Sequence, residues 1–559
     1  MVRMVRRRKV FFLILVIAIV AVTASMVWLR SYLFSSLTVG LNEKIDSLRV
    51  SGLTITYDSI SVDWMKNVIQ IDGVLAQRNA YDTTCTYPEF VRIDAVRATG
   101  LRLIPLVMRN TLSVANLYLD DARIVMRPNS LFRLDSASIK RKKFALRFDR
   151  IFAKSAHVEY LDSATCARLL GFKTDFLADD VSMEFDPGHP MSWKAGRMTF
   201  DSLQIRVLDH PSTYEVRRIE ADLAHNLVSI DTIRLIPDFG KSEYGRRFGY
   251  EVDRIEGTIP FIRAHGLRLD MTDSVRISAS ALEVQFYLQV YRDKRLPFKS
   301  EHKYLPTTRL RRLPFGLTLD SLKVIKSYVQ YEERRSESPA PGKVYFDDLE
   351  AVFLNVSNNP KSEMKLEAHA LLMGDGKVTL AARFPVAANR RASMRGTLRD
   401  FTISKINSML TPAANLKVES GNMENLSFNF LYSAKESTGE IELNYRDLKL
   451  AIFKEEENTK GKGPEKDNFK SFMLNTFVFR KNMDGNVPEE KRKGAVSYMR
   501  DDSRSIFNFW MNSVLSGIKS AYDLDKKAEK KSKRQLKQEE RLVRREARKA
   551  RKAKSKDRG

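Results

Sequence analysis

Cysteine and histidine are scarce in this 559-residue chain, and their scarcity limits the chemistry that the chain can carry out. The sequence contains two cysteines, Cys85 and Cys166, and seven histidines. Two isolated cysteines form no disulfide framework, and whether they pair or stay separate thiols is left open. His157, His265 and His369 stand singly in strand-like segments, where a hydrogen-bonded histidine is more frequent than a metal ligand.

Compact catalytic and nucleotide-binding motifs are missing as well. The chain has no G-x-S-x-G, H-E-x-x-H, P-loop or G-x-G-x-x-G motif. Three pairs of adjacent aspartates could suggest a carboxylate dyad, but neighbours on a strand point to opposite faces, so turn chemistry explains them better. We therefore predict a protein that is not an enzyme and uses no cofactor or metal. The aspartate pairs are Asp120/Asp121, Asp179/Asp180 and Asp347/Asp348.

Long hydrophobic runs are rare too, and only the segment 10–29 has membrane-spanning length. It carries no charge, and thirteen of its twenty residues are Leu, Ile, Val or Phe. Twenty helical residues span about 30 Å, the thickness of a bilayer's hydrocarbon core. We predict one transmembrane helix here, with Trp28 and Arg30 at the membrane interface. The alternative is a cleavable signal peptide, with Val22 and Ala24 before the cleavage site.

Positive charge gathers before this segment and predicts its orientation. The positive-inside rule places the basic end of such a helix in the cytoplasm. We therefore predict a cytoplasmic segment over residues 1–9 and translocation of the chain after Arg30. The topology-determining residues are Arg3, Arg6, Arg7, Arg8 and Lys9.

The whole chain has a net charge of +26, from 95 basic and 69 acidic residues. In a cytosolic protein this excess would suggest nucleic acid as a partner. The predicted topology excludes nucleic acid and leaves anionic lipids or acidic envelope polymers. Residues 524–559 predict a solvated basic tail, since Asp525–Gly559 holds 17 basic and 6 acidic residues. The alternative is an electrostatic contact of this tail with anionic lipid or an envelope polymer.

Residues 501–523 predict an amphipathic helix, with Ser503 or Ser505 as its N-cap. Two interpretations have equal weight: the helix caps the end of a groove or faces the membrane, or it packs on its own sheet. The residues of its predicted apolar face are Phe507, Trp510, Val514, Ile518 and Ala521.

Most of the chain between residues 48 and 359 predicts short β-strands with one apolar face, because apolar and polar residues alternate. Residues 146–160 align without gaps with residues 317–331, which indicates an internal repeat. The shared unit is a strand, an Asp-containing turn or bulge, and another strand. Such units bury their apolar faces only by stacking on neighbours. We therefore predict a mainly β fold: an elongated, repetitive antiparallel sheet that forms a groove.

We expect the groove region to cover residues 30–360 and a further β region to cover 361–500. Within the second region, residues 365–373 and 377–384 predict a hairpin in which Gly374 and Gly376 supply positive φ angles.

Six sites share the order Asp, hydroxyl residue, aliphatic residue, which resembles a sequon of some bacterial periplasmic O-glycosylation systems. A turn at a strand edge is the favoured interpretation. The sites begin at Asp46, Asp58, Asp201, Asp231, Asp273 and Asp320.

Several segments of the C-terminal third resemble the C-terminal region of AsmA-like proteins. They are Gly396–Ile403, Ile406–Leu410, Leu416–Gly421 and Leu426–Phe430. A DUF748-related branch of that family has segments similar to Tyr445–Leu450, Phe469–Val478, Arg500–Trp510 and Ser516–Lys519.

The resemblance in sequence covers residues 365–519. The N-terminal anchor and the β repeats resemble the family only in the order of these elements along the chain. It implies a protein of the bacterial inner membrane, related in shape to bridge-like lipid transfer proteins, with most of the chain in the periplasm. The implied function is transport of phospholipid acyl chains in an apolar β-groove for outer-membrane assembly or homeostasis. The alternative is a non-catalytic envelope scaffold or regulator that binds proteins or wall polymers. The residues of a lipid-binding groove remain unknown from the sequence.

Overall fold

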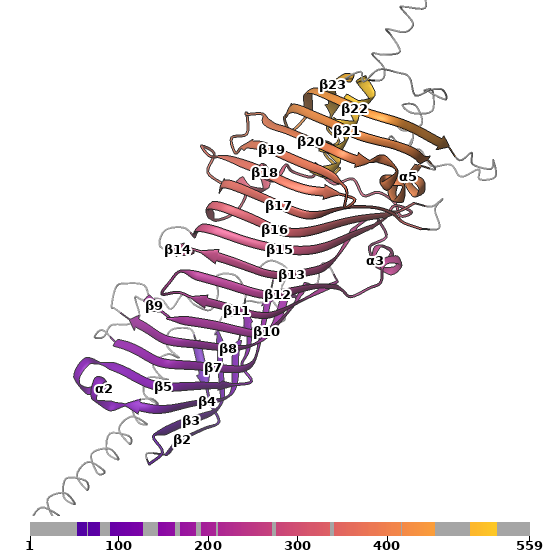
Figure 1. Cartoon of the computed structure of the whole chain (residues 1–559). Helices are drawn as coiled ribbons and strands as arrows, with labels where there is room; N and C mark the ends of the chain where they lie inside the picture. Colours follow the sequence, from indigo (N-terminus) through magenta and orange to yellow (C-terminus); the bar gives the residue numbers. More distant parts are fainter. Residues whose placement is uncertain are drawn as a thin grey trace, which may run out of the picture. The chain divides into compact units, whose positions relative to one another are not determined.

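A computed structural model of the chain places its described residues in a mainly β fold (Figure 1). The chain divides into two compact units, Met1–Asp238 (unit 1) and Phe239–Gly559 (unit 2). The expected boundary at residue 360 falls between two neighbouring strands of unit 2. The structure describes residues 53–63, 65–78, 90–126, 144–161, 168–185, 192–207, 211–270, 275–335, 340–414, 416–452 and 492–521.

Several predicted features lie outside these residues. The segment 10–29 and the tail over 524–559 are among them, as are Cys85 and Cys166. Among the described residues, no helix is both long and apolar enough to cross a membrane. The predicted topology-determining and interfacial residues outside the described ranges are Arg3, Arg6, Arg7, Arg8, Lys9, Trp28 and Arg30.

Unit 1 is described from residue 53 and consists of strands with one short helix, α2 (Leu103–Arg109). Its strands are β1 (Leu53–Thr56), β2 (Ser59–Asp63), β3 (Val68–Arg78), β4 (Phe90–Arg102), β5 (Thr111–Asp120), β6 (Arg123–Met126), β7 (Phe144–Leu161), β8 (Arg168–Phe185), β9 (Ser192–Lys194), β10 (Arg197–Val207), β11 (Ser212–Asp222) and β12 (Leu227–Pro237).

Unit 2 combines strands with short helices and a longer C-terminal helix over 506–521. Its strands are β13 (Asp253–His265), β14 (Arg268–Asp270), β15 (Arg276–Asp293), β16 (Gly316–Arg334), β17 (Gly342–Ser357), β18 (Glu363–Leu372), β19 (Gly376–Pro385), β20 (Ala392–Thr402), β21 (Leu416–Tyr432), β22 (Glu436–Ile452) and β23 (Arg492–Met499). Its short helices are α3 (Lys241–Phe248), α4 (Pro306–Arg311), η2 (Ile403–Ile406) and α5 (Asn407–Ala414).

The prediction of a purely antiparallel sheet is wrong at two places. Most neighbouring strands are antiparallel, but β7 runs parallel to both β5 and β6, and β16 runs parallel to β15. A parallel pair needs a crossover connection instead of a hairpin. In unit 2 this connection is the segment 294–315, which contains α4. The sheet of each unit is therefore mixed.

These parallel junctions coincide with the internal repeat that the sequence indicates. Residues 146–160 lie in β7 and residues 317–331 lie in β16, and each strand pairs in parallel with a preceding strand and antiparallel with the next. The aligned residues Ser155 and Lys326 both have positive φ angles, 58° and 38°. Both stand at register shifts that mark β-bulges. The two segments therefore share pairing and bulge position.

Bulges also explain why the prediction of short strands is wrong. The repeated unit is one long bulged strand, as in β7 with 18 residues and β16 with 19. Ser202 and Thr232, from two of the Asp-hydroxyl-aliphatic sites, have positive φ angles within β10 and β12. Asp180 and Asp348 occupy the same backbone region. These residues bend long strands instead of ending them.

We expect Lys326→Val to lower the free energy of unfolding by about 1.5 kcal/mol, because a β-branched residue is strained at positive φ. Thermal unfolding of the full chain measures this cost. Lys323→Val is the matched control, since Lys323 is an exposed lysine of the same strand without a positive φ. An equal effect of the two substitutions would contradict the bulge.

The predicted hairpin at residues 365–384 is confirmed as β18 and β19. Gly374 has the expected positive φ of 68°, whereas the second positive φ belongs to Met373, at 55°, and not to Gly376. The turn therefore lies one residue earlier than predicted.

Candidate functional site

One face of unit 1 is apolar across eight strands. The pairing registers bring together two rows of side chains that run from β3 to β12, perpendicular to the strands. The first row is Ile69, Ala98, Leu117, Ile151, Ala178, Met198, Ala221 and Val228. The second row is Ile71, Val96, Leu119, Ala153, Phe176, Phe200, Ile219 and Ile230.

The opposite face of the same strands is more polar, as period-two alternation predicts, although Tyr118, Phe152 and Leu177 lie side by side on it. A row on that face carries side chains of alternating charge: Arg150 lies 3.7 Å from Asp179, and Arg197 lies 3.9 Å from Asp222. The arginine side chains of these pairs are more than half exposed, so each pair contributes little to stability. They identify the solvent face of unit 1.

The apolar face of unit 1 is built and lined by strands. Ile151, Ala178 and Val181 form one of its buried clusters, with side chains of neighbouring strands packed against them. In α2, the one described helix of unit 1, the side chains of Ile104 and Met108 are 74% and 78% exposed. Most side chains of the two rows are only half-buried, so this face remains accessible in the described residues.

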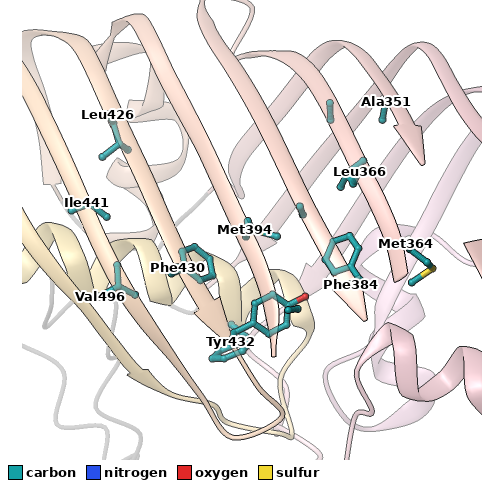
Figure 2. Packing of buried hydrophobic residues seen from close by; sticks show 14 of the residues in the cluster. Ala351, Met364, Leu366, Phe384, Met394, Leu426, Phe430, Tyr432, Ile441 and Val496 are labelled. Atoms are coloured by element: carbon teal, nitrogen blue, oxygen red, sulfur yellow. The ribbon is translucent and has the colours of Figure 1, made fainter. Parts of the chain in front are cut away.

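Unit 2 repeats the pattern with two apolar rows across ten strands, from β13 to β23. One row is Ala264, Leu282, Leu322, Phe353, Leu366, Ala382, Met394, Phe430, Gly439 and Val496. Figure 2 shows several of these residues pointing to one side of the sheet, where a helix crosses the strands.

That helix, over residues 506–521, covers the apolar face of β19 to β23, and we call it the covering helix. Phe509 is 1% exposed and its ring lies 5.7 Å from that of Tyr432. The ring of Trp510 lies 6.2 Å from that of Phe384 in β19. The backbone N–H of Asn508 donates to Ser505 Oγ at 3.3 Å, so Ser505 is the N-cap that the sequence offered. The interpretation of a helix packed on its own sheet is confirmed.

The predicted apolar face is confirmed except at Phe507, and Ala521 is 1% exposed. Phe507 is 72% exposed, whereas Trp510, Val514 and Ile518 are partly buried against the sheet. The deepest positions recur every four residues, at Phe509, Ser513, Gly517 and Ala521. The small residues in this series, Ser513, Gly517 and Ala521, allow the helix to approach the strands closely. Their four-residue spacing is the feature of the sequence that indicates this buried side of the helix.

An ionic cluster lies beside the beginning of the covering helix, where the ends of β13, β15 and β16 meet. Glu333, 7% exposed, accepts from Lys294 at 2.7 Å and from Arg335 at 2.8 Å. Arg292 binds Asp253 through two hydrogen bonds of 2.7 Å. A charge as deeply buried as that of Glu333 requires partners.

The pKa of Glu333 reflects two opposing effects. Burial acts to raise this pKa, but Lys294 and Arg335 outweigh burial and hold it below its usual value of 4.5. A carboxylate with a lowered pKa in the fold contributes stability above its usual pKa, and this stability is lost as the pH falls through the folded pKa. Glu251 has the opposite shift, because burial raises its pKa more than its basic neighbours lower it.

We expect Glu333→Gln to lower the free energy of unfolding by about 2 kcal/mol near pH 7, because it removes the buried negative charge that Lys294 and Arg335 pair with and replaces one acceptor oxygen by an NH2 group. The difference between variant and wild type should shrink as the pH falls below 4.5. Thermal unfolding of both proteins as a function of pH measures it. A difference that stays constant into acid would rule out the charged pairs as its cause.

The isolated histidines have no common site. His369 lines a shallow hollow on the polar face of β18 to β21, together with Glu367 and Arg395. His157 and His265 lie in β7 and β13. Within the described ranges, no three His, Cys, Asp or Glu side chains are grouped so that they could hold a metal ion.

No model of a protein family matches the chain, and no curated protein matches it in sequence.

Proposed function

We propose that this chain is a membrane-anchored, AsmA-like envelope protein that binds phospholipid acyl chains on the apolar face of unit 1. The observation that carries the proposal is the pair of apolar rows across eight strands, with no charged side chain in either row. An acyl chain forms no hydrogen bonds, so a surface without donors or acceptors suits it. A protein interface instead usually combines apolar anchors with polar groups.

The proposed arrangement has three further parts. Residues 10–29 anchor the chain in the bacterial inner membrane, with the N-terminus in the cytoplasm and the rest in the periplasm. The tail over 524–559 contacts anionic lipid head groups or an acidic envelope polymer. The protein carries lipid for outer-membrane assembly or homeostasis without catalysing a reaction.

A substitution on the apolar face tests this proposal. Ile230→Asp places a charge in the second row of β12, and we expect it to lower the affinity for phospholipid at least about tenfold, because the charge would lie against acyl chains. The readout is fluorescent phosphatidylethanolamine retained by the full chain on a native gel. The control is Ser229→Asp, the preceding residue of the strand, which lies on the polar face. Equal retention by the two variants would refute lipid binding at this face.

A non-catalytic scaffold is the second candidate function. The observation that favours it is the covering helix, which fills the apolar face of β19 to β23 with side chains of the chain itself. A scaffold would use the exposed polar faces to bind proteins or wall polymers. It would retain no phospholipid in the same gel, with or without Ile230→Asp.

A further inference from the structure

The covering helix has the dimensions needed to cross the apolar face where it lies. Its sixteen residues, 506–521, span about 24 Å. Five neighbouring strands such as β19 to β23 extend over about 19 Å. The contacts follow this path, since Trp510 lies near Phe384 of β19, and Gly517 lies against Ile441 of β22 and Val496 of β23.

Hydrogen bonds involving serine side chains of the helix also hold it on β22 and β23. Ser513 and Ser437 are both 0% exposed, and their hydroxyl groups are 2.7 Å apart. Along β23, the backbone N–H groups of Ala495 and Ser497 donate to Ser520 Oγ and Ser516 Oγ at 3.1 and 3.2 Å. Lifting the helix would break all three of these contacts.

The segment before the helix is also fixed to unit 2. The backbone N–H of Lys303 donates to the carbonyl of Asp502 at 2.7 Å, and His302 Nδ1 lies 2.9 Å from the carboxylate of the same residue. The guanidinium of Arg504 lies 3.5 Å from the centre of the Phe298 ring. Residues 298–303 belong to the crossover connection before β16, so the helix is held at its beginning as well as along its length.

From these contacts we infer that the covering helix is a fixed internal occupant of the apolar face, where it takes the place of an acyl chain. Acyl chains therefore bind the apolar face of unit 1 and are excluded from the face of β19 to β23. This inference rests on the proposed lipid binding. It assigns the apolar face of β19 to β23 as closed to lipid.

Photo-crosslinking of the full chain tests the inference. The chain is reconstituted in vesicles of phosphatidylethanolamine and phosphatidylglycerol that contain a phosphatidylethanolamine with a diazirine in its acyl chain. After irradiation, mass spectrometry of peptides maps the labelled residues. We expect labelled peptides from β7, β8, β10 and β11 of unit 1 and none from β20 to β23.

Each other outcome has a separate meaning. Labels on β21 or β22, near Phe430 or Ile441, would overturn the inference while supporting lipid binding. An absence of labels from the strands of both units would overturn the proposed function, and the inference with it. Labels within residues 10–29 would come from the proposed membrane anchor and serve as the positive control for the reaction.

Discussion

Phe509→Ala should lower the free energy of unfolding by about 4 kcal/mol, because it truncates a large, fully buried side chain. The Phe509 side chain is 1% exposed and lies between Tyr432 and Tyr498, with ring centres 5.7 and 6.1 Å away. Truncation removes this contact and leaves a cavity between the covering helix and the sheet. Thermal unfolding of the full chain measures the loss, and hydrogen exchange in residues 506–521 locates it.

Phe507→Ala is the matched control, because it removes the same side chain two residues earlier in the same helix. Phe507 is 72% exposed, so its loss should cost about 0.5 kcal/mol or less. The contrast between the two substitutions defines the buried face of the helix. A larger cost for Phe507→Ala than for Phe509→Ala would mean that the helix is turned the other way.

Gly494→Ala should lower the free energy of unfolding by about 3 kcal/mol, because it separates the covering helix from β23. A Cβ atom on Gly494 would lie 2.0 Å from the carbonyl oxygen of Gly517 and 2.7 Å from the amide nitrogen of Ala521. Both are backbone atoms, so the whole helix would have to move. The displaced helix would also expose the edge amides of β23, and we expect faster hydrogen exchange there.

Gly171→Ala provides the control for the glycine substitution itself. Gly171 lies within β8, and a Cβ atom there would have no neighbour within 4 Å. Its replacement should be neutral or slightly stabilising, because alanine loses less conformational entropy in a strand than glycine does. If Gly494→Ala were equally neutral, the close approach of helix and strand would be refuted.

Local sequence patterns predict much of the secondary structure, but not the length of the strands. Alternation predicts β structure, and the Ser155 and Lys326 segments align because both encode a long bulged strand. An aspartate or serine within a strand predicts a turn, because these residues favour both turns and positive φ angles. Whether the chain turns or only bulges depends on pairing with the next strand, which is non-local.

The apolar faces and their cover depend on contacts distant in sequence. Each strand shows which of its side chains are apolar, but the continuous rows arise from the registers between eight or ten strands. The parallel junctions at β7 and β16 likewise depend on crossovers, which no local pattern determines. In the covering helix, the most hydrophobic side includes Phe507. The side that is buried instead carries the smaller residues Ser513, Gly517 and Ala521, because Gly494 of β23 allows the helix backbone to approach closely there.

Native mass spectrometry of the full chain, released from mild detergent micelles, tests the central proposal most directly. If the apolar face of unit 1 binds acyl chains, the spectrum should contain the polypeptide with one or more diacyl phospholipids attached, and Ile230→Asp should reduce these species. A spectrum of bare polypeptide alone, for the wild-type chain and under conditions that preserve known protein–lipid complexes, would contradict the proposal.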